Sequence, residues 1–154
     1  MDKYLENLAK ESYQSLLKSL DEIKWHYTTL GSKMAVRYTV NSKDLPIEFY
    51  LKVDAETQLI IAISRLPLRV IENKRAEIAL AVNHVNFKLA DGNFDFDVEK
   101  GLIYYKMSIS YRDSLIGDKL VEYLLNVSAG TVDRFNDKFD AIAKGELSID
   151  EFLE

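Results

Sequence analysis

Two neighbouring segments of the chain, residues 34–40 and 47–53, alternate apolar and polar side chains with a period of two. Successive side chains of a strand point to opposite faces, so this alternation predicts two strands that each bury one face. Turn-forming residues follow each segment, at 42–46 and 54–57, and both turns are short enough to join antiparallel neighbours. The apolar positions are Met34, Val36, Tyr38 and Val40, then Ile47, Phe49, Leu51 and Val53.

The next segment, residues 58–65, contains five consecutive apolar residues, from Leu59 to Ile63. A strand that is apolar on both sides is typical of the middle of a sheet, or of a sheet that faces something beyond its own helices. A further short strand is expected over residues 24–28. The first half of the chain therefore predicts an antiparallel meander of three or four strands.

Helical periodicity precedes and follows this meander. Apolar residues recur at spacings of three and four over residues 2–20, which predicts an amphipathic helix. A second helix is expected to begin with Asn73 as its cap and to run to about Leu89. A long third helix is expected between Gly117 and Gly145, because glycine commonly ends helices.

Alternation returns between the second and third helices, over residues 94–98 and 102–111, and predicts a β-hairpin that turns at Gly101. Ser148 and Glu151 have the spacing of a capping box, so a last short helical turn is expected there. The predicted fold class is α+β: an antiparallel sheet with an N-terminal helix, a central helix and a long C-terminal helix, in the order α-β-β-β-(β)-α-β-β-α. Residues 1–154 are expected to form a single domain.

Composition excludes several classes of function. The chain has no cysteine, which rules out disulfides and thiolate metal sites. Its formal net charge of −5 repels phosphate backbones, so no nucleic-acid partner is expected. No secretory signal and no apolar run near the ~20 residues of a membrane helix is present, so a cytoplasmic protein without a membrane partner is expected.

The acidic alternation from Asp91 to Glu99 resembles the start of a calcium loop. An EF-hand loop beginning at Asp91 requires glycine at its sixth position and glutamate at its twelfth, where this chain has Phe96 and Leu102. The two histidines, His26 and His84, lie on different predicted elements. No phosphate loop or nucleophile elbow is present either, so no catalytic residue, cofactor or metal is predicted, and the protein is not expected to be an enzyme.

Aromatic and aliphatic side chains give the strongest indication of a surface that binds either a protein partner or a second copy of the chain. Tyr50, Ile60 and Tyr104 are expected on strand faces opposite those assigned to the core. Exposed apolar side chains of this kind are typical of interfaces. The alternatives are that helices cover both faces of the sheet, or that these residues pack at its edges.

Several structural motifs follow one another from Asn73 onward. They are residues 81–87, with the paired Asn83 and Asn86; residues 91–97; residues 101–105; and the glycines Gly117 and Gly145 around the last long helix. With these motifs the segment resembles the YbjN-like family of small bacterial proteins, which are similar in fold to the cytoplasmic chaperones of type III secretion effectors. The resemblance implies a homodimer-prone binding module without enzyme activity, and the family is also described as sensory-transduction regulators.

The predicted function is therefore a non-enzymatic cytosolic protein-binding module, chaperone-like or adaptor-like, which acts as a homodimer and binds a protein or peptide. The alternative is a small-ligand-responsive sensory or regulatory protein, with a pocket between the long helix and the sheet near Phe135 and Phe139.

Overall fold

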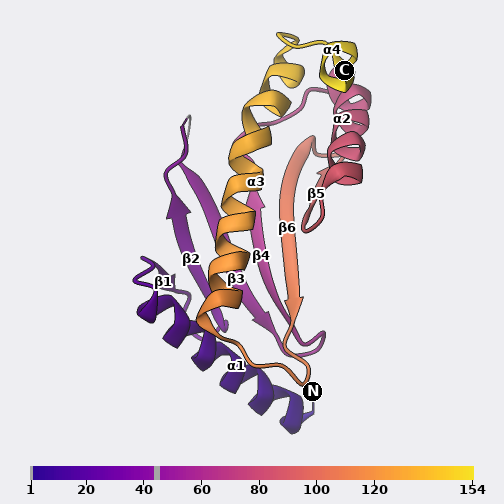
Figure 1. Cartoon of the computed structure of the whole chain (residues 1–154). Coiled ribbons are helices and arrows are strands. Elements are labelled where there is room, and N and C mark those ends of the chain that lie inside the picture. The colour runs from indigo at the N-terminus through magenta and orange to yellow at the C-terminus, as the bar shows by residue number, and fades with distance from the viewer. Residues whose placement is uncertain (1, 44–45) are drawn as a thin grey trace.

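The computed structural model describes residues 2–43 and 46–154 and contains one antiparallel sheet with helices around it (Figure 1). Of the predicted turn at 42–46, positions 44 and 45 lie outside the described residues. The predicted fold class is confirmed. The elements in chain order are α1 (Lys3–Glu22), β1 (Thr28–Thr29), β2 (Ala35–Val40), β3 (Ile47–Asp54), β4 (Leu59–Arg65), a 3-10 turn η1 (Glu72–Lys74), α2 (Arg75–Lys88), β5 (Asn93–Asp97), β6 (Leu102–Ser110), α3 (Asp118–Lys144) and α4 (Ile149–Leu153).

The strand order is β1-β2-β3-β4-β6-β5, and every neighbouring pair is antiparallel. The apolar strand β4 is central, as its sequence predicts. The short strand expected over residues 24–28 is shifted to Thr28–Thr29, where it pairs with β2. Helix α2 connects β4 to the β5–β6 hairpin, which returns so that β6 lies beside β4.

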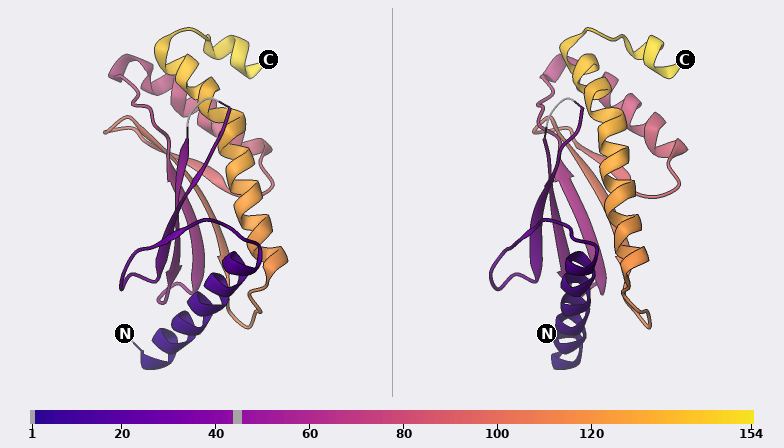
Figure 2. Two further views of the ribbon diagram at one scale, coloured as in Figure 1. Left: turned by 90° about the vertical axis from the view of Figure 1, so that its left-hand side faces the viewer. Right: turned by 60° about the vertical axis from the view of Figure 1, so that its left-hand side comes forward.

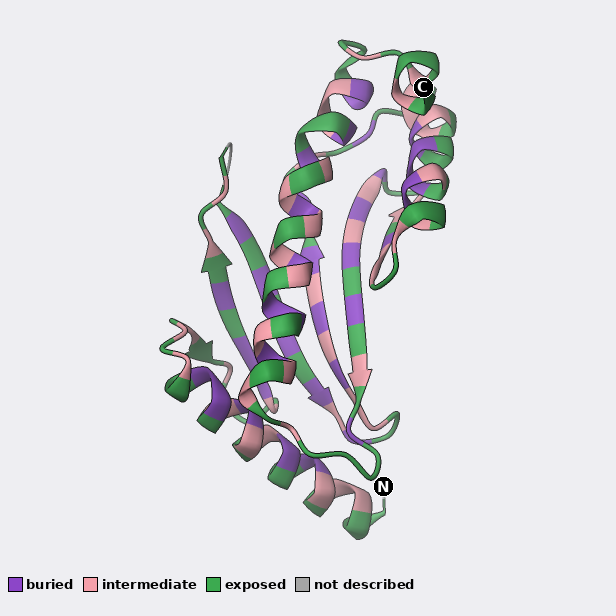
Figure 3. Ribbon diagram, in the orientation of Figure 1, coloured by how far each residue is buried: buried purple, intermediate pink, exposed green. Residues whose placement is uncertain are grey.

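The helices α1 and α3 pack on the same face of the sheet, which we call the covered face (Figure 2). Alternate residues of β3, β4 and β6 point into the core there, and Figure 3 shows the resulting stripes of buried and exposed residues along β3 and β6. Tyr38 stacks on Phe49 with ring centroids 5.2 Å apart, and Trp25 meets the edge of Tyr38 at 5.7 Å. These contacts join the beginning of the sheet to the end of α1.

The asparagine pair of α2 has two different roles. The side-chain amide of Asn86 donates to the carbonyl of Phe94, and its oxygen accepts from the Phe94 amide, both at 2.8 Å. This double hydrogen bond fixes α2 to the edge strand β5. Asn83, three residues earlier in the helix, is exposed to solvent. Gly92, between the two elements, has a φ of +73°, and a Cβ there would overlap the hydroxyl of Tyr105.

Two of the helix-end predictions are confirmed and one is wrong. Gly145 ends α3 in the left-handed conformation, and Ser148 and Glu151 form the predicted capping box of α4. Asn73, however, is not the cap of α2. It lies inside η1, and Lys74 occupies the cap position without a side-chain hydrogen bond. A short 3-10 turn thus begins this helix in place of an asparagine cap.

Candidate partner-binding surface

The second face of the sheet, which we call the open face, carries the side chains that alternate with the core residues. None of the described helices packs on it. Strand register arranges its centre in rows. Two rows are Ala35, Lys52, Ile61 and Ser108, and Arg37, Tyr50, Ile63, Lys106 and Asn93; next to them Thr39 pairs with Glu48, and Arg65 with Tyr104, which also pairs with Asp95.

Two of the three predicted surface residues lie on this face. Tyr50 is 40% exposed, and Tyr104 is partly exposed opposite Arg65 and Asp95. The prediction for Ile60 is wrong, because Ile60 is completely buried on the covered face, between Val53 and Ile109. Residues 59–63 are all apolar, so the sequence does not show which of them point toward the core.

Sequence reasoning missed two isoleucines that follow Ile60 in the same strand. Ile61 and Ile63 point to the open face and are partly exposed, with Ile63 directly opposite Tyr50. Together with Tyr50 and Tyr104 they form what we call the apolar centre of the open face. The buried partners Leu51 and Val53 on β3 would have fixed the phase of β4 once the pairing register was known.

A groove of about 630 Å³ adjoins the apolar centre. Tyr50 and Ile63 form part of its wall. The first residue of β2 with the segment before it, and the last three residues of β3 with the turn after it, form the rest. Most of the lining is apolar, and its apolar members are Leu30, Met34, Ala35, Tyr50, Val53, Ala55 and Ile63. The groove extends the apolar centre toward one end of the sheet.

Charged side chains surround the apolar centre. Lys106 forms an ion pair with Asp95 at 3.0 Å, and Arg37 lies 3.9 Å from Glu48. The hydroxyl of Tyr50 donates to the Glu48 carboxylate at 2.8 Å, which raises the pKa of this phenol. Such exposed pairs contribute little to folding, since solvent screens them. Their arrangement around an apolar patch is the usual composition of a protein interface, with an apolar core and a polar rim.

A second exposed apolar surface lies on α2, on the side that faces away from the core. Phe87 is 90% exposed and Leu80 is 56% exposed, and Asn83 lies between them on the same side of the helix. We call these residues, with Ala76, the outer stripe of α2. The four positions are spaced by four, three and four residues, so they share one helix face, and none carries a charge.

The pocket that was predicted between the long helix and the sheet, near Phe135 and Phe139, is not found at that position in the described structure. Phe139 is completely buried in the core, where its ring lies 5.1 Å from that of Phe94. Phe135 does line a hollow, of about 330 Å³, but the hollow lies between α2, α3 and α4 and not between α3 and the sheet. We call it the three-helix groove.

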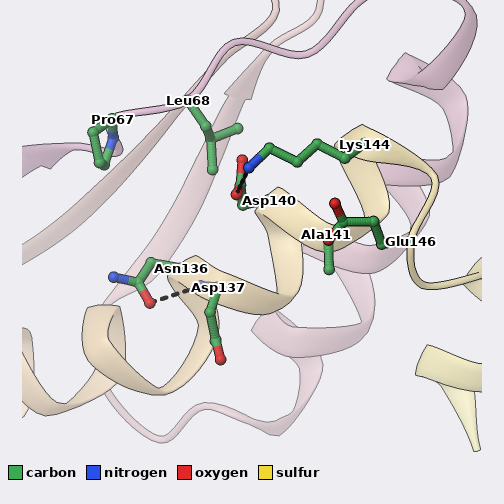
Figure 4. A pocket seen from close by; sticks show the side chains of 8 residues that line it. All are labelled: Pro67, Leu68, Asn136, Asp137, Asp140, Ala141, Lys144 and Glu146. Atoms are coloured by element: carbon green, nitrogen blue, oxygen red, sulfur yellow. Dashed lines mark hydrogen bonds and ion pairs between the residues drawn. The ribbon is translucent and has the colours of Figure 1, made fainter. Parts of the chain in front are cut away.

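Another hollow, of about 500 Å³, lies between the end of α3 and the segment after β4 (Figure 4). Asp137, Asp140 and Glu146 line it, and the ammonium group of Lys144 occupies an ion pair with Asp140 at 2.5 Å. Among residues 2–43 and 46–154, no three histidine or carboxylate side chains are placed to hold a metal ion. Within the same residues no helix is long and apolar enough to cross a membrane.

Comparison with known proteins gives a family and a fold. Residues 12–141 match the family model YbjN, described as "putative bacterial sensory transduction regulator". Among solved structures, the crystal structure of Escherichia coli YbjN, described as "a putative transcription regulator", superposes with a TM-score of 0.61 at 12% identity, over 86% of this chain and 92% of that one. No curated protein matches the sequence.

A second solved structure, that of the HopA1-SchA chaperone-effector complex, contains a chain that is similar to this one. The TM-score is 0.55 at 15% identity, over 90% of this chain and 97% of that chain. At such identities the similarity establishes a shared fold.

Proposed function

The chain belongs to the YbjN family, and on this basis we propose that it is a non-enzymatic, cytoplasmic protein-binding module of the chaperone or adaptor type. The observation that carries the proposal is the open face of the sheet. Its apolar centre is exposed between charged residues and adjoins an apolar groove. A binding module needs such a surface, whereas a self-contained fold does not.

The shape of the surface indicates the kind of partner. Tyr50 and Tyr104 offer rigid aromatic area that orders at low entropic cost, and the groove beside Tyr50 accepts an apolar side chain. Arg65 lies beside Tyr104 and forms no ion pair within the described residues, and Arg37 and Lys52, which pair with Glu48 and Asp54, add further positive charge. We propose that the partner is a peptide segment with apolar anchors and acidic flanks. The fold shared with a chain of a chaperone-effector complex supports this class of partner.

The outer stripe of α2 supports the homodimer in this proposal. In an antiparallel pair of α2 helices with the two-fold axis at Asn83, Leu80 of each chain would pack against Phe87 of the other, since both lie within one turn of the axis. The two Asn83 amides would meet and could hydrogen bond to each other. The open faces remain free for partners in this arrangement.

The absence of cysteine from the sequence permits a direct test of the dimer. Asn83→Cys places a thiol at the proposed axis, so mild oxidation should give a disulfide-linked dimer on a non-reducing gel. Thr39→Cys, on the open face, is the matched control and should remain monomeric on the gel. Light scattering that shows a monomer at high concentration, unchanged by Phe87→Glu, would refute the dimer.

The binding proposal is tested by affinity capture from the native cell, followed by mass spectrometry. Proteins retained by the wild-type chain should be lost with Tyr104→Glu, which puts a charge into the apolar centre beside Asp95. Leu115→Glu is the control, because Leu115 is 95% exposed in the loop before α3 and away from the open face. Equal retention by all three chains would refute a role for the open face.

A second function is favoured by the three-helix groove. Its volume of about 330 Å³ is at the lower end of the range of small-molecule sites, which is about 300–1,000 Å³. We propose it as the site of a ligand-responsive regulator, which agrees with the sensory description of the family.

A further inference from the structure

The three-helix groove has an apolar floor. Val85 comes from α2 and Leu89 follows its last residue, Phe135 comes from α3, and Phe152 comes from α4. The ring of Phe152 lies 5.9 Å from that of His84 and 6.3 Å from that of Phe139, so α4 closes one side of the groove through aromatic contacts. A floor of this kind accommodates an aliphatic chain or a small ring.

The rim of the groove is basic. Lys88 comes from α2, and Arg134 and Lys138 come from successive turns of α3. Both α3 cations lie over the Phe135 ring, at 5.2 Å for Arg134 and 5.6 Å for Lys138. This places their charges directly above the apolar floor.

These three cations form no ion pair with a carboxylate in the described parts of the chain. The single acidic residue on the groove is Glu151. Its carboxylate already accepts hydrogen bonds from the hydroxyl and the amide of Ser148, at 2.8 and 3.1 Å. The groove is therefore a local cationic site in a chain whose net charge is −5.

We infer that the three-helix groove binds a small amphiphilic anion, whose apolar body lies on Phe135 and Phe152 and whose carboxylate contacts Arg134 and Lys138. The inference rests on the second function proposed above and names the chemical class of its ligand. The volume suits a medium-length acyl chain or a phenylalkyl group. An uncharged analogue would leave the cations unused, and a cationic analogue would be repelled by them.

Isothermal titration calorimetry on the full chain tests this class with octanoate, 3-phenylpropionate, octanol and octylammonium as probes. We expect saturable binding of one carboxylate per chain, at least tenfold tighter than octanol, weakened by salt, and no binding of octylammonium. The preferred carboxylate distinguishes an acyl from an aryl body. Equal affinities for octanoate and octanol, or no octanoate binding up to millimolar concentration, would overturn the inference.

Variants locate the site. Arg134→Gln with Lys138→Gln removes both charges above Phe135 and should weaken octanoate binding at least tenfold, while leaving octanol unchanged. Lys52→Gln with Lys106→Gln removes two cations from the open face and should leave octanoate binding unchanged. The opposite pattern would overturn the assignment to this groove. Tight binding of octanol or octylammonium in place of the acids would refute the anionic class yet preserve a ligand-responsive function, which separates the two failures.

Discussion

The covered and open faces of the sheet are built from the same strands but differ in almost every other respect. On β3, the inward residues Phe49, Leu51 and Val53 are at most 1% exposed, whereas Tyr50 between them is 40% exposed. The covered face has an apolar residue at nearly every position, and the open face mixes apolar and charged side chains. Folding requires only the first face. The composition of the second is therefore the better guide to function.

The largest difference in stability between the two faces is expected at the consecutive residues Phe49 and Tyr50. Phe49→Ala removes a completely buried ring that stacks on Tyr38 and should lower the free energy of unfolding by about 3–5 kcal/mol. Tyr50→Ala should lower it by about 1 kcal/mol or less, because Tyr50 is partly solvated. Urea denaturation measures both. Similar losses for the two variants would mean that the open face is part of the stabilising core.

The asparagine pair of α2 extends the same contrast to a helix. Asn86→Ala leaves the buried Phe94 backbone without its two hydrogen bonds and should cost about 2–3 kcal/mol. Asn83→Ala, the matched control, removes an exposed amide and should change stability by less than about 0.5 kcal/mol. Denaturation should be done on both at a concentration where each is in the same oligomeric state. If Asn86→Ala lowered the free energy of unfolding less than Asn83→Ala, the double hydrogen bond of Asn86 to Phe94 would not be what holds α2 to β5.

The stability of the protein should depend on pH through Asp54, which lies beside the groove that adjoins the apolar centre. Asp54 accepts hydrogen bonds from Lys52 at 2.8 Å and from the Thr57 amide at 3.0 Å, and these lower its pKa from 3.8 to about 2. A lowered pKa means that the stabilisation is complete above about pH 4 and is lost as the pH falls toward 2. Asp54→Asn should therefore cost about 1–2 kcal/mol at pH 7 and much less near pH 2. A cost that is independent of pH would contradict this origin.

The smallest expected effect is a gain. Tyr38 is 3% exposed on the covered face, and its hydroxyl is the one buried side-chain polar atom in the described structure without a hydrogen-bond partner. Burial also raises the pKa of this phenol. Tyr38→Phe keeps the stacked ring and removes the unsatisfied group, so stability should rise by about 0.5–1 kcal/mol in thermal or urea denaturation. A loss of that size would indicate a partner for the hydroxyl.

Sequence patterns predicted the fold well where the period was clear, and less well where it was not. Alternation on β3 and β6 placed Tyr50 and Tyr104 on the correct face, because each strand has one polar side. On β4 no polar residue interrupts Leu59–Ile63, so the phase depended on pairing with β3, a contact between strands that no local pattern contains. Ile60 was misassigned for that reason.

The candidate sites depended still more on tertiary structure. The outer stripe of α2 could have been suspected, since Leu80 and Phe87 make the helix apolar on a second side. The three-helix groove could not, because it brings together residues 84–89, 134–138 and 147–152, which lie in or directly beside three separate helices. Its cations are unremarkable in the sequence, and only their position around Phe135 and Phe152 makes them a candidate binding site.

The central claim is that the open face binds a partner while the covered face maintains the fold. The most direct test is the equilibrium affinity of the captured partner for the double variant Tyr50→Ala with Tyr104→Ala, measured together with its urea denaturation. We predict that affinity falls about thirtyfold or more, as expected when interface anchors are removed, while the free energy of unfolding falls by no more than about 1–2 kcal/mol. Unchanged affinity in a fully folded variant would contradict the account.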